Sequence, residues 1–263
     1  MTSTTSADGT TIAFDVVGAG GPTLVLLPGA TCTRGVTAPL AERLGERLTV
    51  VNVDRRGRGD SDDRADVPPY EAEREVEDVA AVIEAVGPAA VYGHSSGAAL
   101  AIRAAAAGIG VTHLVAHDAP YNLPGDEAHG RAWHEQLHAL LAVDRPDDAM
   151  AAFLGLVGMP AEAVESMREA PHWPALVGVA PTLAYDSAAL GDRDGGLVPT
   201  DLLGGIDVPA LVMAGGADHG FMIDVARSIA GALPDARFEH LVGAGHDAGP
   251  DVVAPPVLAF LLD

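Results

Sequence analysis

Residues Gly93-His94-Ser95-Ser96-Gly97 are the most informative part of this 263-residue chain. It follows an apolar run over 89–92 that is typical of a buried strand, and a helical pattern begins directly after it. Gly-x-Ser-x-Gly between a strand and a helix predicts a sharp turn from which the serine projects, with glycines that let strand and helix come close. Ser95 is therefore the candidate nucleophile. It lies at the N-terminus of a helix whose partial positive charge favours a developing oxyanion.

The same alternation of strand and helix patterns runs along most of the chain. Short apolar strands separated by amphipathic helices indicate a mostly parallel central sheet with helices on both faces, the α/β class. The strands are expected near 11–17, 23–27, 49–53, 89–92, 113–116, 210–214 and 237–242, and the helices near 36–48, 70–86, 96–107 and 222–233, with a last helix toward the C-terminus.

One segment, from Asp118 to about Pro199, interrupts this alternation. It has no strand pattern but several helical ones, over 126–143, 146–156 and 160–168. The simplest interpretation is a helical cap inserted between two strands of the sheet. We therefore expect a core formed by residues 1–118 and 200–263, and a cap or lid formed by 119–199.

Charge excludes several kinds of partner. The chain carries 37 acidic and 15 basic residues, a formal net charge of −22, and every basic residue is arginine. Without lysine there is neither a Schiff base nor a phosphate-binding P-loop. The negative charge repels phosphate backbones and anionic lipids, so we expect no nucleic-acid partner and no membrane partner. A small-molecule substrate remains the expected partner.

Cysteine content and the N-terminal stretch bear on the compartment. Cys32 is the single cysteine, which excludes an intrachain disulfide and a multi-cysteine metal site. The first eight residues have neither a basic start nor an apolar stretch, so we expect no signal peptide. These features favour a reducing, cytoplasmic location.

A serine nucleophile needs a base, and the base needs an acid that orients it. The candidate acid is Asp218, directly after the predicted strand 210–214. The candidate base is His246, directly after the predicted strand 237–242. Both are on loops at the carboxyl ends of strands, where an open α/β sheet places its active site.

These features together resemble the α/β-hydrolase family, in its serine-nucleophile branch with a helical lid. The stretch Asp-Arg-Arg-Gly-Arg-Gly-Asp-Ser over 54–61 is similar to the Asp-x-Arg-Gly-x-Gly-x-Ser segment common in that family, and the likeness extends over essentially the whole chain. The resemblance implies Ser95 as nucleophile, His246 as general base and Asp218 as acid. It also implies oxyanion donation by the backbone N–H groups of Ala30 and Ser96. Pro28-Gly29 stands where many members have His-Gly.

Rival assignments remain for some of these roles. Asp118, after the predicted strand 113–116, occupies a position from which some members of the family supply the acid. His94 is expected to turn away from the site, beneath the sharp turn at Ser95, which we call the elbow. His219 is expected to shape the loop that carries Asp218 or to line the pocket. The other histidines lack metal-ligand spacing and no His-Glu-x-x-His occurs, so we expect no metal.

A cap folded over Ser95 would roof an apolar pocket, which favours a small or medium neutral substrate over a polymer. Candidate pocket residues, from the cap and from the loops near the elbow, are Cys32, Trp133, Phe153, Met159, Trp173, His219, Phe221 and Met222.

The predicted function is hydrolysis of a carboxylic ester or lactone through an acyl-enzyme on Ser95, with no cofactor. The same triad also serves carbon–carbon bond hydrolysis, lyase steps and cofactor-free haloperoxidase or perhydrolase chemistry, because fold does not determine function. A non-catalytic ligand-binding module of the same fold is a further alternative. The substrate and the oligomeric state are not predicted by the sequence.

Overall fold

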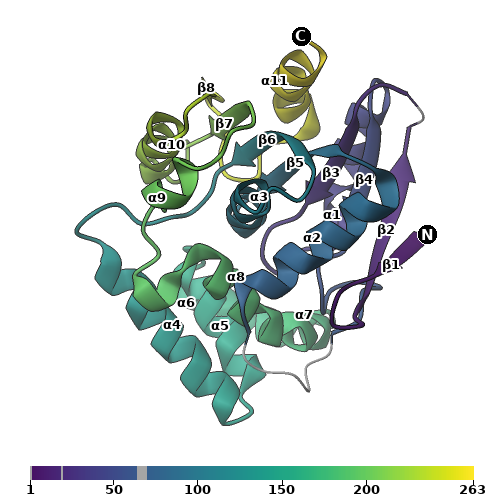
Figure 1. The fold of residues 1–263 in the computed structure, drawn as a ribbon. Helices are drawn as coiled ribbons and strands as arrows, with labels where there is room; N and C mark the ends of the chain where they lie inside the picture. Colours follow the sequence, from purple (N-terminus) through teal and green to yellow (C-terminus); the bar gives the residue numbers. More distant parts are fainter. Residues whose placement is uncertain (1, 19, 64–69) are drawn as a thin grey trace.

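The computed structural model describes residues 2–18, 20–63 and 70–263 (Figure 1). Eight strands form one sheet in the order β1-β2-β4-β3-β5-β6-β7-β8. Their bounds are β1 Thr2–Thr5, β2 Thr11–Val17, β3 Thr23–Leu27, β4 Thr49–Val53, β5 Ala89–His94, β6 Val111–His117, β7 Ala210–Ala214 and β8 Ala236–His240. The sheet is parallel from β4 to β8, and β2 pairs antiparallel with both β1 and β4. This confirms the predicted α/β class and adds β1, which the sequence analysis did not predict.

Strand register brings the candidate residues to one edge of the sheet. His94 at the end of β5 is level with His117 at the end of β6, and His117 is level with Met213 in β7. Residues that follow these three strands therefore emerge side by side, because parallel strands present their carboxyl ends at the same edge. Ser95 and Asp118 are the first residues beyond β5 and β6.

Two helical layers cover the sheet, and alternate strand residues point to each. Val25 and Leu27 of β3 pack in one buried cluster with α2, α3 and α10, whereas Leu24 and Leu26 pack in another with α1 and α11. This period of two is what a strand buried on both faces requires. The helices are α1 Arg34–Gly45, α2 Ala72–Val86, α3 Ser96–Ala106, α10 Phe221–Ala232 and α11 Pro250–Leu262.

Between β6 and β7 the named elements of the structure are all helical. They are α4 Glu127–Ala142, α5 Pro146–Leu156, α6 Ala161–Arg168, α7 Trp173–Val179, α8 Leu183–Leu190 and α9 Thr200–Leu203, with 3-10 turns over Ala180–Thr182 and Asp192–Asp194. We call α4 to α8 the inserted helices. They gather at one side of the sheet (Figure 1) and have their own apolar cluster, which includes Trp133, Leu137 and Trp173. The predicted helices over 126–143, 146–156 and 160–168 match α4, α5 and α6.

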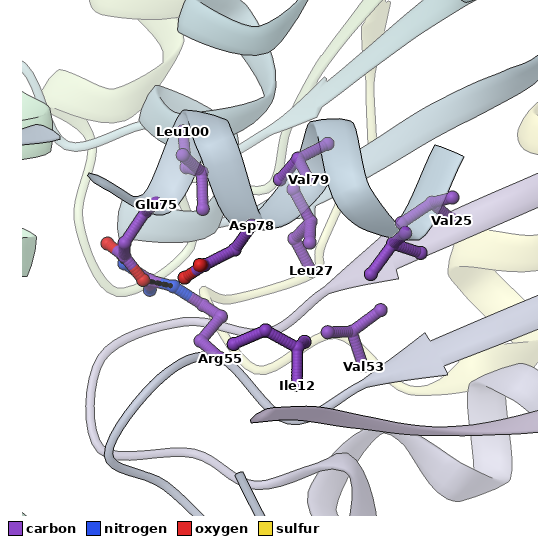
Figure 2. A pocket seen from close by; sticks show the side chains of 10 residues that line it. Ile12, Val25, Leu27, Val53, Arg55, Glu75, Asp78, Val79 and Leu100 are labelled. Carbon is purple, nitrogen blue, oxygen red and sulfur yellow. Dashed lines mark hydrogen bonds and ion pairs between the residues drawn. The ribbon is translucent and has the colours of Figure 1, made fainter. Parts of the chain in front are cut away.

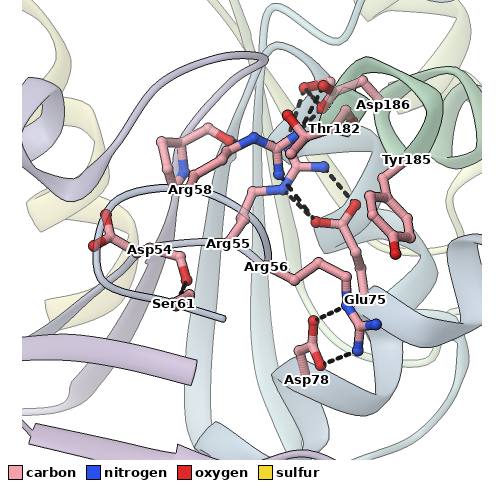
Figure 3. A network of polar contacts seen from close by, with 12 residues as sticks. Asp54, Arg55, Arg56, Arg58, Ser61, Glu75, Asp78, Thr182, Tyr185 and Asp186 are labelled. Atoms are coloured by element: carbon pink, nitrogen blue, oxygen red, sulfur yellow. Dashed lines mark hydrogen bonds and ion pairs between the residues drawn. The ribbon is translucent and has the colours of Figure 1, made fainter. Parts of the chain in front are cut away.

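Three buried arginines of the loop after β4 join the sheet to its helices (Figure 3). Arg55 donates to both carboxylate oxygens of Glu75 in α2, at 2.8 and 2.6 Å. Arg58 donates to Asp186 in α8 at 2.7 Å. Each guanidinium is at most 1% exposed, so the charges neutralise one another in the interior rather than facing water.

Arg56, between these two, makes a separate pair. Its guanidinium donates to both oxygens of Asp78 in α2, at 2.7 and 2.6 Å, and to Asp8 at 2.9 Å. Planar two-point contacts of this kind are the arrangement that arginine, and not lysine, makes with a carboxylate. The arginine-rich stretch is therefore a structural loop.

A small void lies beside the Arg55 pair, between α2 and the sheet (Figure 2). Its volume is about 10 Å³, and aliphatic side chains such as Ile12, Val25 and Val79 surround it. That is room for about one water molecule, so this void is part of the core and not a ligand site. Among the described helices, none combines the length and the apolar character needed to cross a membrane.

Replacing Arg58 by methionine tests the buried network. Arg58→Met leaves the carboxylates of Asp186 and Glu75 facing the single guanidinium of Arg55, so one buried negative charge loses its partner. We expect the free energy of unfolding to fall by about 3 to 5 kcal/mol. Urea denaturation measures the change, with Arg145→Met at an exposed ion pair as the control that changes little. Equal, small losses in the two variants would contradict the role given to the network.

Candidate active site

The backbone of Ser95 is strained in the way an exposed nucleophile requires. Its φ of 57° and ψ of −126° lie in a region that residues other than glycine rarely adopt. The turn is held because the Ser95 N–H donates to the carbonyl of His117 in β6 at 2.9 Å. A Cβ on Gly93 would lie 2.0 Å from the carbonyl oxygen of Gly97, so the motif needs glycine there.

The loop after β3 runs against this turn. A Cβ added to Gly29 would lie 3.1 Å from the Cβ of Ser95, tighter than ordinary van der Waals contact. The next residue, Ala30, lines a cavity together with Ser95 and Ser96. Glycine at 29 is thus the residue that lets Ala30 approach the elbow.

His246 reaches the same cavity from the loop after β8. Its ring Nδ1 lies 3.4 Å from the Oδ2 of Asp118. Within the described part of the chain, both atoms are buried and neither has a hydrogen-bond partner. Each is therefore placed to satisfy the other, which leaves the Nε2 of the ring as the atom available to a substrate or to Ser95.

Asp118 is fully buried at the end of β6, with a φ of 50°. Its Oδ1 accepts the backbone N–H of Gly215 at 3.1 Å, while Oδ2 lies 3.4 Å from His246 and 3.6 Å from the Nε2 of His117. The carboxylate thus points toward the histidine ring from beneath.

Asp218 contacts a different part of the same histidine. Both of its carboxylate oxygens lie 3.0 Å from the backbone nitrogen of His246, and this hydrogen bond lowers the pKa of the Asp218 carboxyl. Asp218 therefore holds the main chain of His246, whereas Asp118 faces its ring. Both acids were expected at this edge of the sheet from the sequence, which favoured Asp218 for the contact with the ring.

Two further histidines lie against His246. His94 donates from Nε2 to the carbonyl of His246 at 2.9 Å, and the two ring centroids are 4.6 Å apart. Burial lowers the pKa of His94 to about 4, with the neighbouring His246 adding to the shift, so His94 is neutral at pH 7. His94 thus packs against the His246 ring, whereas the sequence predicted that it turns away from the site. His219 lines the cavity.

A buried tyrosine determines the tautomer of His117. The Tyr92 hydroxyl is 2.7 Å from the Nδ1 of His117. Burial raises the pKa of Tyr92 and lowers that of His117, so the hydroxyl keeps its proton and the ring is neutral. The Oδ2 of Asp118, 3.6 Å from Nε2, can only accept, which favours the tautomer in which Nδ1 accepts from the Tyr92 hydroxyl. The other ring nitrogen, Nε2, then carries the hydrogen that faces Asp118.

Metal-binding residue types come together once among the described residues. His94, Asp118 and His246 each place a ligand atom within 4.8 Å of the others. Two of these groups already have partners there, because His94 donates to the main chain and Asp118 accepts from Gly215. The arrangement orders these side chains around the ring of His246.

The cavity at this edge has a volume of about 230 Å³. Five of the pocket residues expected from the sequence line it, and three do not. Trp173 is buried among the inserted helices with its indole N–H directed to Asp147. The lining ones are Trp133, Phe153, His219, Phe221 and Met222, and those outside the lining are Cys32, Met159 and Trp173.

Four polar residues in the cavity wall were not expected from the sequence. They are Asn122, Asp186, Ser187 and Asp192. Asp186 had a signal that could have been used: an acid within the apolar stretch Leu183–Leu190 requires a buried cation as partner. That the partner is Arg58, distant in the chain, could not be deduced from spacing.

Comparison with known proteins identifies the family. The model of the alpha/beta hydrolase family matches residues 24–255, which is most of the chain. The chain belongs to the alpha/beta hydrolase family. It is a hydrolase, as the resemblance in its sequence indicated.

Similar proteins include one solved structure and two proteins matched by sequence. A crystallised alpha/beta hydrolase from Sphaerobacter thermophilus is 42% identical, with a TM-score of 0.82 over 98% of this chain and 99% of the other. A 2-(acetamidomethylene)succinate hydrolase from Mesorhizobium japonicum is 28% identical over 92% of this chain and 88% of its own length. An N-formylmaleamate deformylase from Pseudomonas putida is 36% identical, but the match spans only 52% of each protein.

Relief of the strain at the elbow can be measured. Glycine adopts the backbone conformation of Ser95 freely, so Ser95→Gly is expected to be more stable than Ser95→Ala by about 1 kcal/mol. At Glu165, exposed in α6, alanine is expected to be more stable than glycine by about the same amount. Urea denaturation of the four variants checks this. Alanine being the more stable residue at both sites would contradict a strained elbow.

Proposed function

We propose that this hydrolase cleaves a small or medium, largely apolar carboxylic ester or lactone through an acyl-enzyme on Ser95. The observation that carries the proposal is the strained serine between β5 and α3, in one cavity with a histidine whose Nδ1 faces a buried carboxylate. A serine, a base and an orienting acid in this relation are recognised by geometry and not by sequence position.

Asp118, and not Asp218, is proposed as the orienting acid. The carboxylate of Asp118 is buried and 3.4 Å from the ring nitrogen that needs a proton acceptor. In that position it holds the tautomer with the hydrogen on Nδ1 and stabilises the imidazolium that forms during reaction. Asp218 supports the loop by accepting the backbone N–H of His246.

The reaction proceeds in two halves. The Nε2 of His246 takes the proton of the Ser95 hydroxyl as Oγ bonds to the substrate carbonyl carbon. The same Nε2 then gives this proton to the departing alkoxide as the carbon–oxygen bond breaks, leaving an acyl-enzyme. Water repeats the sequence with His246 again as base, and releases the acid and free Ser95.

Backbone N–H groups of Ala30 and Ser96 are proposed as the oxyanion donors. Ser96 opens α3, so its N–H lies at the positive end of the helix dipole. Each such donor contributes about 3 to 4 kcal/mol to transition-state stabilisation in serine hydrolases. The side chain of Ser96 is separately held by Asp186, whose Oδ1 accepts its hydroxyl at 2.8 Å.

Cavity size and lining support the substrate class. A volume of about 230 Å³ suits a small molecule and not a polymer, and aromatic and aliphatic side chains form much of the wall. Residues 119–199 are proposed to act as the cap that roofs it, with Trp133 and Phe153 turned to the substrate.

Amide hydrolysis is the second candidate. It is favoured by the names of two relatives, a deformylase of N-formylmaleamate and a hydrolase of 2-(acetamidomethylene)succinate, both of which denote N-acyl compounds. The same triad carries out this reaction if His246 protonates a leaving nitrogen instead of oxygen.

Labelling with a fluorophosphonate tests the nucleophile. Intact-protein mass spectrometry is expected to find one label per chain on Ser95, and none in Ser95→Ala or His246→Ala. Turnover of a 4-nitrophenyl ester is expected to fall by about 10⁶ in Ser95→Ala, as in other serine hydrolases. If Ser95→Ala keeps a tenth of the wild-type activity, the proposed mechanism is wrong.

A matched pair of aspartate variants separates the two acids. Asp118→Asn is expected to lower kcat by about 10⁴, because the amide favours the wrong histidine tautomer. Asp218→Asn is expected to lower it less than about tenfold, since the asparagine oxygen still accepts the backbone N–H of His246. Steady-state kinetics on one ester decides between them, and the reverse order of effects would return the role to Asp218.

A further inference from the structure

The cavity wall has no permanent positive charge. Among the described residues that line it there is no arginine, and the chain contains no lysine. A carboxylate on the substrate would therefore lose its hydration without gaining a paired cation, which is costly in a closed site.

The arginines behind this wall are already neutralised. Arg55 and Arg58 lie 2.8 and 2.7 Å from the two oxygens of Asp186, and both also contact Glu75. Two cations thus face two carboxylates. No charge from this group is left over for a ligand.

Other arginines near this end of the cavity are also turned to other partners or to solvent. Arg103 donates to the carbonyls of Ala188 and Ala189, at 3.4 and 2.6 Å. Arg193 is exposed, and neither residue is in the cavity lining.

Asp192, unlike Asp186, is an acid of the cavity wall without a cationic partner among the described residues. It is only 5% exposed, and within the described part of the chain its carboxyl makes no ion pair. Burial raises its pKa to about 7, despite a hydrogen bond with the Ser187 side chain, and the charge of Asp186 adds to the rise. Its Oδ1 and the amide of Asn122 flank Gly196, where a Cβ would lie 2.6 and 3.2 Å from them.

We propose that Asp192 makes the enzyme select substrates that carry an N–H or O–H donor on the part lying against the inserted helices, and reject substrates with a carboxylate there. This assignment rests on the proposed function, because it places the substrate of that reaction in this cavity. The carboxyl oxygens of Asp192 accept the donor in either protonation state.

Four esters with matched chains test the selection. They are 4-nitrophenyl hexanoate, adipamate, 6-aminohexanoate and adipate, whose acyl chains end in methyl, carboxamide, ammonium and carboxylate. The wild-type kcat/KM is expected to be at least about 100-fold higher for the adipamate than for the adipate. An adipate cleaved within about threefold of the adipamate or of the 6-aminohexanoate would overturn the proposal.

Variants at position 192 locate the effect. Asp192→Leu is expected to lower the adipamate-to-adipate ratio about tenfold or more. Asp194→Asn, two residues on and exposed, removes the same charge outside the cavity and is expected to leave the ratio unchanged. An unchanged ratio in a folded Asp192→Leu protein would exclude Asp192 as the determinant.

Binding measurements test the selection by Asp192 separately from the proposed ester hydrolysis. Calorimetric titration of the same esters onto Ser95→Ala reads selection without turnover, and the adipamate is expected to bind more tightly than the adipate. If the wild type cleaves none of the esters but this order of binding holds, the reaction is wrong and the selection stands. If the esters are cleaved without preference and bind alike, the reaction stands and the selection is wrong.

Discussion

The carboxylate of Asp186 is the contact on which the position of the active site depends. It lies in α8, among the inserted helices, and accepts from Arg58 in the loop after β4 and from the hydroxyl of Ser96, the residue after Ser95. Buried charges are tolerated only with their partners in place, so these three elements cannot separate without a large cost. The start of α3 and the inserted helix α8 are thereby joined through one buried carboxylate.

Charge is distributed unevenly between the interior and the pocket. The chain has a net charge of −22, yet Arg55, Arg56 and Arg58 are all buried against acids of α2 and α8. These acids neutralise the arginine charges, and the ion pairs join the loop after β4 to α2 and α8. The described part of the cavity wall therefore has apolar, acidic and neutral polar side chains but no arginine. This lack of a cation is the physical basis for selecting against anionic substrates.

Much of the fold was predictable because hydrophobic periodicity reports burial directly. The strands after the first and the helices α4, α5 and α6 were expected close to their observed bounds. The edge strand β1 was not, because Thr2–Thr5 is polar and largely exposed and so has no apolar pattern. Helix α8 was missed for the opposite reason, since Leu183–Leu190 is buried almost all round and has no polar face to reveal its period.

The strand–turn–helix around Ser95 and the histidine after the last strand could be predicted from the residues alone, because glycine spacing and strand order act locally along the chain. Only the tertiary structure distinguished Asp118 from Asp218. Both follow parallel strands at one edge of the sheet, and their separation from the His246 ring depends on how two loops fold back. The cavity wall was likewise decided by packing, since Asp192 and Asn122 meet at Gly196 from segments far apart in the sequence.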